Sequence, residues 1–458
     1  MPAAPSDLGD IGSLGSRLPA WSALPFLGIL LSIALFPLLA PKVWHHHYPK
    51  VALVWGLLLA GPFLWVFRGA AAHELLRMAI AEYLPFVVLL SALFTIGGGI
   101  HLEGRLPGRP GANAALLALG TLLASLLGTT GAAMILIRPL LAANAGRRYR
   151  AHTVVFFTFL VGNIGGALTP LGDPPLFLGF LSGVPFFWTL ALAPEMLCVA
   201  GLVLVLYFGL DSLLFRREAA AVRQRPARPE PLRVQGAHNL LFLLGVLSAV
   251  ILSGLWHPGE IDVLGIQEPI ENLARDGVLV LLLLGSWFTT APRIREANGY
   301  SWAPIREVAI LFAAIFATIL PVLAILKAGE RGALAPVLSA VHTPGQFFWA
   351  TGVLSSLLDN APTYLAFLST ALGRFFPGVP ERTAVLRLIA EHPDFLRAIA
   401  TGAVFMGANT YLGNAPNFMV KSIAEEAGVE MPSFLGYVGR YSLPVLLPVF
   451  LLATWIFF

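Results

Sequence analysis

Cysteine and charged residues are scarce in this sequence. Cys198 is its only cysteine and lies in an apolar segment, which excludes a disulfide and a thiolate metal site. Only 12% of the 458 residues are charged, whereas 57% are hydrophobic. A soluble chain of this length needs a polar surface that this composition does not supply. The composition therefore predicts an all-α polytopic membrane protein.

The sequence also lacks the features of a nucleic-acid-binding module and of a cleavable signal peptide. The formal net charge of +4 comes from short Arg-rich connecting segments, which fit the inner membrane face better than a nucleic-acid-binding module. Arg17 is the only basic residue ahead of the first apolar run, 24–40, so the positive region of a cleavable signal peptide is absent. We expect an N-terminal segment 1–23 followed by the first span, with the lipid bilayer and not nucleic acid as partner.

Apolar stretches long enough to cross a bilayer recur along the whole chain. A span needs about 20 mostly apolar residues. The candidates are 24–40, 51–67, 83–100, 152–184, 188–210, 238–255, 277–291, 306–326, 394–427 and 441–458. We therefore expect about 10 or 11 spans.

A stretch of twelve residues occurs in two similar copies, one in the segment 152–184 and one in the segment 394–427. Residues 166–177 read GALTPLGDPPLF and residues 407–418 read GANTYLGNAPNF, with seven identities. Each copy interrupts an apolar stretch with polar and helix-breaking residues. Paired interruptions of this kind are the pattern of broken helices at a transporter binding site.

A second pair of matching segments precedes the two predicted broken helices. Residues 125–132 and 356–363 each lie between apolar arms that are too short to span the membrane twice. Irregular backbone at membrane depth is found where it lines a cavity or is buried in protein. We therefore expect re-entrant hairpins at about 113–145 and 346–375, whose tips share a polar cavity with the helix breaks.

The distribution of Lys and Arg predicts the orientation of the chain. The Arg- and Pro-rich segment 216–237 should be cytoplasmic, and the acidic segment 255–276 should be outside. Counting spans from these segments gives 24–215 and 238–458 opposite orientations, with both termini outside the inner cell membrane. Two inverted-topology repeats are the arrangement of many secondary transporters.

The tips and breaks carry oxygen-bearing side chains, which suit alkali cations and not transition metals. Because Asp173 aligns with Asn414 and Asp359 with Gly128, we expect two cation sites with one carboxylate each. The first candidate set is Gly128, Thr129, Thr130, Gly131, Asn163, Thr169, Gly172 and Asp173. The second is Asp359, Asn360, Pro362, Asn409, Thr410, Gly413 and Asn414. Pro174, Pro175 and Pro416 are expected to shape the breaks.

The two aspartates are the main functional candidates. A charged side chain at the centre of a membrane costs ~2.5 to 3.5 kcal/mol on insertion scales, so it usually serves a function. Na⁺ (or Li⁺) and H⁺ would compete for the carboxylate oxygens of Asp173 and Asp359. The alternative is that both aspartates cap helices and that the Thr and Asn side chains satisfy freed backbone groups.

Several polar residues are assigned no role by the sequence. His45, His46 and His47 are expected in a solvated interfacial loop. Glu195 lies in the span 188–210, where a proton relay and a water-exposed setting remain alternatives. No organic cofactor is expected.

The patterns Gly-Asp-Pro-Pro at 172–175 and Leu-Asp-Asn-Ala-Pro at 358–362 resemble those of the ion transporter superfamily. This superfamily includes citrate transporters, divalent anion/sodium symporters, arsenite permeases and D-type bacterial Na⁺/H⁺ antiporters. The resemblance covers nearly the whole chain. It implies a homodimer in which a transport region moves like an elevator against a scaffold region.

The hairpin tips differ from those of the dicarboxylate symporters in this superfamily. Those proteins carry Ser-Asn-Thr at both tips, where this chain has Gly128-Thr129-Thr130 and Asp359-Asn360-Ala361. The difference favours the antiporter branch.

We therefore predict a secondary transporter, and not an enzyme, that exchanges Na⁺ or Li⁺ for H⁺. The alternative is an ion-coupled carrier of citrate or another small carboxylate or oxyanion. A remote alternative is an intramembrane aspartyl protease. Pro170-Leu171-Gly172-Asp173 lacks the first glycine of the Gly-x-Gly-Asp motif of such proteases, and a protease does not explain the inverted repeat.

Overall fold

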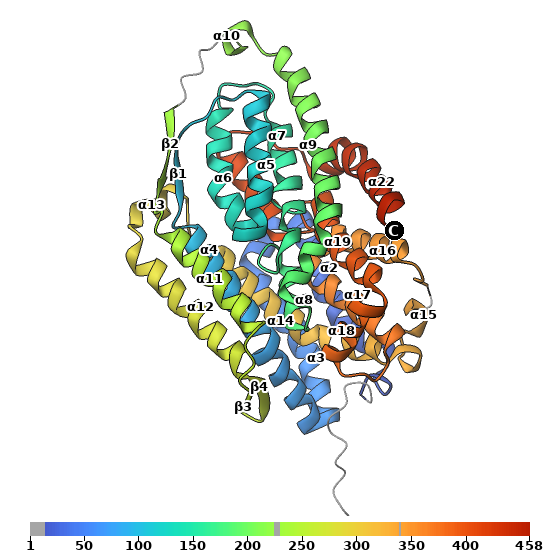
Figure 1. Ribbon diagram of the computed structural model, residues 1–458. Coiled ribbons are helices and arrows are strands. Elements are labelled where there is room, and N and C mark those ends of the chain that lie inside the picture. Colours follow the sequence, from blue (N-terminus) through green and yellow to red (C-terminus); the bar gives the residue numbers. More distant parts are fainter. Residues whose placement is uncertain (1–13, 224–229, 339) are drawn as a thin grey trace, which may run out of the picture.

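The computed structural model describes residues 14–223, 230–338 and 340–458 and is built almost entirely of helices (Figure 1). Residues 1–13 of the expected N-terminal segment and 224–229 of the expected linker lie outside the described residues. Among the described residues, seven helices are long and apolar enough to cross a membrane. The prediction of an all-α polytopic membrane protein is confirmed. The expected spans 152–184 and 394–427 are each divided into two shorter helices, because a break interrupts each of them.

The first half of the chain contains a helical hairpin followed by a broken helix. The hairpin consists of α5 (Pro110–Leu127) and α6 (Thr129–Ala143), and the broken helix of α7 (Ala151–Leu160) and α8 (Pro174–Leu181). The other helices of this half are α2 (Leu24–Leu39), α3 (Pro41–Met78), α4 (Leu84–Gly97), α9 (Ala193–Arg216) and α10 (Ala220–Arg223).

The second half repeats this order of elements. Its hairpin consists of α16 (Pro344–Leu357) and α17 (Asn360–Phe375), and its broken helix of α19 (Pro393–Met406) and α20 (Ala415–Glu426). The other helices are α11 (Asn239–Ser253), α12 (Ile270–Thr289), α13 (Pro292–Ala297), α14 (Ala303–Lys327), α15 (Ala335–Leu338), α18 (Glu381–Glu391), α21 (Phe434–Tyr437) and α22 (Leu447–Phe457).

Helix α3 includes the three consecutive histidines. His45, His46 and His47 are exposed, whereas Trp44 and Tyr48 are buried. Residues spaced four apart lie on one face of a helix, so the two buried aromatic rings hold this segment in helical form. The expectation of a loop here was therefore wrong.

Short strands occur in connecting segments of the described chain. β1 (His101–Arg105) pairs antiparallel with β2 (Glu230–Gln235) and joins the segment after α4 to the end of the linker between the halves. β3 (Glu260–Val263) and β4 (Ile266–Pro269) form a hairpin. Its turn residues Leu264 and Gly265 both have positive φ, as a two-residue type I′ turn requires.

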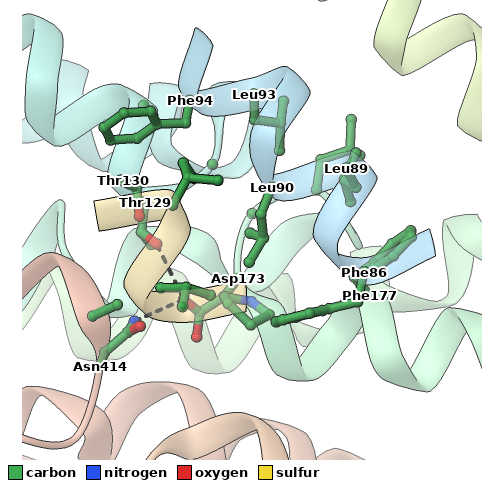
Figure 2. Close-up of a pocket in the computed structure, with 18 of the residues that line it drawn as sticks. Phe86, Leu89, Leu90, Leu93, Phe94, Thr129, Thr130, Asp173, Phe177 and Asn414 are labelled. Atoms are coloured by element: carbon green, nitrogen blue, oxygen red, sulfur yellow. Dashed lines mark hydrogen bonds between the residues drawn. The ribbon is translucent and has the colours of Figure 1, made fainter. Parts of the chain in front are cut away.

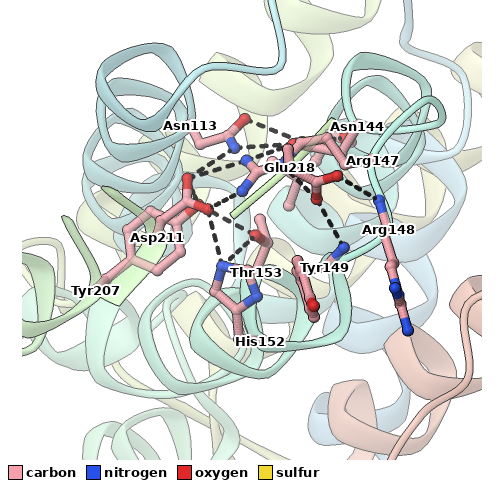
Figure 3. Close-up of polar contacts among 11 residues, drawn as sticks. Asn113, Asn144, Arg147, Arg148, Tyr149, His152, Thr153, Tyr207, Asp211 and Glu218 are labelled. Carbon is pink, nitrogen blue, oxygen red and sulfur yellow. Dashed lines mark hydrogen bonds and ion pairs between the residues drawn. The ribbon is translucent and has the colours of Figure 1, made fainter. Parts of the chain in front are cut away.

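A buried polar network surrounds Asp211 near the end of α9 (Figure 3). The Asp211 carboxylate forms an ion pair with Arg147 and lies 2.8 Å from His152 Nε2. Asn113 Nδ2 donates to it at 3.2 Å. Arg147, His152 and Asp211 are all buried. The network therefore joins α9 to the start of α5, the loop after α6 and the start of α7.

Neighbouring contacts extend this network. Asn113 and Asn144 exchange amide hydrogen bonds of 2.9 Å and so hold the two arms of the first hairpin together at their base. Glu218 accepts the backbone N–H groups of Arg148 and Tyr149 at 3.1 and 2.8 Å. The base of the first hairpin is thereby fixed against α9.

We expect Asp211→Asn to destabilise the fold. The substitution keeps the side-chain shape but removes the closest counter-charge of the buried Arg147 guanidinium, which then keeps, among the described carboxylates, only Glu218 at 4.0 Å. Breaking a buried pair costs about 3 to 5 kcal/mol. Thermal unfolding in detergent measures the effect. The control is Glu391→Gln, which removes an exposed carboxylate paired with Arg387 and should leave the unfolding temperature unchanged. Equal unfolding temperatures for Asp211→Asn and the wild type would contradict the structural role of Asp211.

Candidate functional site

Both hairpin tips and both helix breaks meet at the carboxylate of Asp173. Figure 2 shows two of these contacts, those of Thr129 and Asn414. Asp173 directly precedes α8 and is 1% exposed. Its oxygens accept hydrogen bonds from Thr129 Oγ1 at 3.1 Å, Asn360 Nδ2 at 2.5 Å and Asn414 Nδ2 at 2.8 Å. These donors come from the first hairpin tip, the second hairpin tip and the second break. One carboxylate thus joins elements that are far apart in the sequence.

This arrangement corrects the division into two separate carboxylate sites. We expected Asn360 and Asn414 beside Asp359, but their amide groups contact Asp173. Asp359 instead caps α17, because its Oδ1 accepts the Ala361 N–H at 3.0 Å. An alignment within one chain shows which positions correspond. It does not show which side chains cross between the halves.

A cavity of about 100 Å³ lies beside Asp173, which leaves room for a small ion and several water molecules. Its polar side is formed by the tip and break residues, including Gly128, Thr129, Thr130, Gly131, Gly172, Asp173, Asp359 and Asn414. Its apolar side includes Phe86, Leu90 and Phe94 of α4 (Figure 2), together with Phe312 of α14. Among the described residues that line this cavity there is no Lys, Arg or His.

Glycine allows the backbone of each break to fold closely on itself. A Cβ atom on Gly172 would lie 2.1 Å from the Gly166 carbonyl oxygen, and one on Gly413 would lie 2.5 Å from that of Gly407. Gly128, at the tip of the first hairpin, has a φ of +76°, which side-chain-bearing residues rarely adopt. These positions therefore need glycine for steric reasons.

Proline begins the helix that follows each break. Pro174 and Pro175 open α8, and Pro416 is in the first turn of α20. The missing N–H of proline costs nothing in the first turn of a helix, where the N–H groups have no partner within the helix. Pro362 likewise lies in the first turn of α17.

Thr169 and Thr410 hold the breaks against the hairpins and do not contact Asp173. Thr169 Oγ1 donates to the Ser125 carbonyl, and Thr410 Oγ1 donates to the Ser356 carbonyl at 2.6 Å. Asn409 Nδ2 donates to Ser356 Oγ at 2.9 Å. These candidate ligands satisfy polar groups of the hairpin and break, which was the alternative role considered for them.

Ser125 and Ser356 belong to the site but were not among the sequence candidates. Ser125 Oγ donates to the Gly165 carbonyl at 2.5 Å, and Ser356 Oγ donates to the Met406 carbonyl at 3.0 Å. Each serine thus joins a hairpin arm to the adjacent break. The available signal was their identical position at the start of the matching segments 125–132 and 356–363.

Three amide oxygens of the breaks and of the second hairpin tip lack hydrogen-bond donors, and of these residues Asn414 lines the cavity beside Asp173. Within the described residues, Oδ1 of Asn163, Asn360 and Asn414 is buried and accepts no hydrogen bond. The amide nitrogens of Asn360 and Asn414 donate to Asp173, which fixes which atom of each amide is the oxygen. A buried oxygen without a partner is costly. Such oxygens, together with a carboxylate, fit a hard cation such as Na⁺ or Li⁺.

Helix N-termini also face this site. Helices α6, α8, α17 and α20 begin at Thr129, Pro174, Asn360 and Ala415, which either line the cavity or directly follow a residue that does. The positive ends of the helix dipoles stabilise negative charge nearby. They favour the ionised form of Asp173, and they would also favour an anionic ligand.

Glu195 lies away from this cavity. It is buried in the first turn of α9, and its carboxylate is 2.6 Å from Arg397 Nη2 of α19. Glu195 therefore has an ion-pair partner, and it is not among the residues that line the cavity.

Comparison with known proteins relates the chain to membrane transporters. Residues 15–458 match the model of a family described as "Putative citrate transport". The Na⁺/H⁺ antiporter NhaB of Pseudomonas fluorescens is 26% identical over 270 residues, which are 55% of this chain and 48% of the antiporter. The chain thus spans about half the length of this relative.

Mycobacterial relatives are similar to more of the chain. An uncharacterized transporter of Mycobacterium bovis is 26% identical over 327 residues, which are 68% of this chain and 69% of that transporter. A 46 kDa membrane protein of Mycobacterium leprae is 26% identical over 276 residues, 58% of each chain. The family match extends over nearly the whole sequence. The protein therefore belongs to this citrate transport family, a group of membrane transporters within the ion transporter superfamily.

Proposed function

We propose that this protein is a secondary transporter that exchanges Na⁺ or Li⁺ for H⁺ at Asp173. The main support is the combination of one buried carboxylate with the unpaired amide oxygens of Asn163, Asn360 and Asn414. The similarity to a Na⁺/H⁺ antiporter supports the same chemistry. The cation and the proton are the transported substrates.

Competition at one carboxylate couples the two fluxes. The ionised carboxylate binds a cation together with amide oxygens, whereas the protonated carboxyl is neutral and donates its O–H to one of these oxygens. In both states the charge of Asp173 is neutralised. An uncompensated charge is costly inside a membrane, so the site changes sides most readily when it holds either a cation or a proton.

Asp359 supplies a second negative charge at the cavity wall. Its carboxylate lines the cavity and caps α17 but makes no hydrogen bond to Asp173. A fixed negative charge raises the local concentration of cations in a narrow cleft. We assign Asp359 to the attraction of the cation, with Asp173 as the exchange site.

The setting in the cell follows from the resemblance and from the charge distribution. We propose a homodimer in the inner membrane, with the segment 216–237 in the cytoplasm and both termini outside. The two hairpins would re-enter the membrane from opposite sides. Together with the broken helices they would form the moving region of an elevator.

A carrier of citrate or another carboxylate is the second candidate. The helix N-termini at the cavity favour an anion, and the family description names citrate. The described residues that line the cavity include no Lys, Arg or His to pair with a polyanion. We therefore place this function second.

Purified protein in liposomes with an acid interior and a trapped pH dye separates the two functions. With antiport, adding Na⁺ or Li⁺ alone outside collapses the pH gradient, because each entering cation releases a proton from the carboxylate. Choline chloride at the same concentration is the control. No response to Na⁺ or Li⁺, together with Na⁺-dependent uptake of labelled citrate, would establish the carrier and refute antiport.

Asp173→Asn should abolish this response to Na⁺. Asparagine preserves the size of the side chain but carries no exchangeable proton or charge, so we expect a loss of at least ~100-fold in initial rate, equal to about 2.7 kcal/mol. Asp394→Asn makes the same change at an exposed position paired with Arg397 and should retain the wild-type rate. If Asp173→Asn also retained the wild-type rate, exchange would not occur at this carboxylate.

Asp359→Asn should weaken cation attraction while the exchange site stays intact. Asparagine is as good an N-cap as aspartate, so α17 keeps its first turn. We expect a severalfold higher apparent KM for Na⁺ and a maximal rate within about twofold of wild type, because the substitution removes charge but no ligand of the exchange site. A fall in maximal rate at unchanged KM would argue against this role and would place Asp359 in the exchange step.

A further inference from the structure

Asn163 and Asn417 form a buried bridge between the two helix breaks. Asn163 precedes the 3-10 turn Ile164–Leu168 of the first break, and Asn417 lies in the first turns of α20 after the second break. Asn163 Nδ2 donates to Asn417 Oδ1 at 2.8 Å, and both residues are fully buried. The residues are 254 positions apart, so this contact exists only because the two halves fold together.

The surrounding hydrogen bonds fix the orientation of both amides. Asn417 Nδ2 donates to the carbonyl oxygens of Gly407 at 2.9 Å and Thr410 at 2.8 Å, so its oxygen must face Asn163. Asn163 Nδ2 donates to this oxygen and to the Thr158 carbonyl at 2.8 Å. The oxygen of Asn163 is therefore the atom left without a donor.

The unpaired oxygen of Asn163 lies beside the group that contacts Asp173. A Cβ atom placed on Gly407 would be 2.9 Å from Asn163 Oδ1 and 3.6 Å from Asn360 Nδ2. The same Asn360 nitrogen donates to Asp173 at 2.5 Å. A side chain at position 407 would therefore collide with Asn163 Oδ1, and the glycine allows this oxygen to lie close to the second hairpin tip.

The corresponding positions of the other half are apolar. In the duplicated stretch Asn417 corresponds to Leu176, and Asn163, three residues before the first copy, corresponds to Val404. Leu176 and Val404 are both buried. A pair of amides on one side of the pseudo-symmetric centre therefore has aliphatic side chains as its counterpart on the other.

We propose that Asn417 is a positioning residue that turns the oxygen of Asn163 toward the transported cation and so restricts cation binding to one side of the centre. This inference rests on the proposed cation exchange at Asp173. Without the oxygen of Asn417, the Asn163 amide loses one of the two acceptors that set its orientation and keeps only the Thr158 carbonyl. An amide rotated by 180° would present N–H groups where the cation needs an oxygen.

Replacing the two asparagines of the bridge with the aliphatic residues found at the corresponding positions tests this role. The variants are Asn163→Val, Asn417→Leu and the double variant, with Leu176→Met in the apolar counterpart as control. Each is assayed for thermal unfolding in detergent, with NaCl against choline chloride, and for Na⁺-driven collapse of a pH gradient in liposomes. Each single variant should be less stable, because one buried amide keeps an unpaired group.

We expect stability and cation binding to separate in the double variant. Replacing both amides removes the unpaired groups of the bridge itself, whereas the Gly407 and Thr410 carbonyls lose their donor in Asn417→Leu and in the double variant alike. The double variant should therefore lose less stability than the two single variants combined. Asn417→Leu and the double variant should nevertheless show an apparent KM for Na⁺ raised at least about tenfold, equal to about 1.4 kcal/mol. Leu176→Met should match the wild type in both measurements.

Other outcomes overturn the proposal. Recovery of both stability and wild-type KM in the double variant would make the bridge structural only. A wild-type KM in Asn417→Leu would also refute the positioning role. If the wild-type protein itself responds to neither Na⁺ nor Li⁺, cation exchange at Asp173 is refuted, and the positioning role falls with it. A Na⁺-responsive wild type with an equally responsive Asn417→Leu refutes this inference alone.

Discussion

The buried carboxylate of Asp173 is the point on which the arrangement of the site depends. Its hydrogen bonds come from the first hairpin tip, the second hairpin tip and the second break, so it holds both halves of the chain together. A charge at this depth is tolerated because helix N-termini and amide groups face it. The amide groups that donate to it, Asn360 and Asn414, keep unpaired oxygens, which are the ligands of the proposed cation site.

Pseudo-symmetry supplies the scaffold of the site, and departures from it supply the chemistry. Thr129 and Asn360 occupy equivalent tip positions, and both donate to Asp173. Glycine pairs shape both breaks, and a threonine fastens each break to its hairpin. The symmetry is broken where Asp173 in the first half corresponds to Asn414 in the second. It is also broken at the Asn163–Asn417 bridge, because the corresponding residues are Val404 and Leu176. One site with a single central carboxylate is therefore built from a duplicated framework.

Contacts far from the cavity fix the elements that form it. The network around Asp211 joins the base of the first hairpin and the start of α7 to α9. The tip of that hairpin is in turn bonded to the first break, through the Thr129 N–H and the Gly172 carbonyl at 2.8 Å. The first hairpin is thus held at both ends. A hairpin that is held at both ends keeps Thr129 in place beside Asp173.

Local sequence determined the helical fold class, the hairpins and the breaks, since composition, apolar length, glycine and proline act within a few residues along the chain. It also indicated Asp173 as a candidate site residue. Tertiary structure decided which side chains contact one another. The sequence assigned Asn360 and Asn414 to Asp359, and it left Asn417, Ser125 and Asp211 without a role. These contacts join positions that are distant in sequence. Aligning the two halves shows which positions correspond, but it does not show which side chains of one half contact the other half. The direction of an amide oxygen depends on all its neighbours at once, so only the folded chain could show which oxygens remain available to a cation.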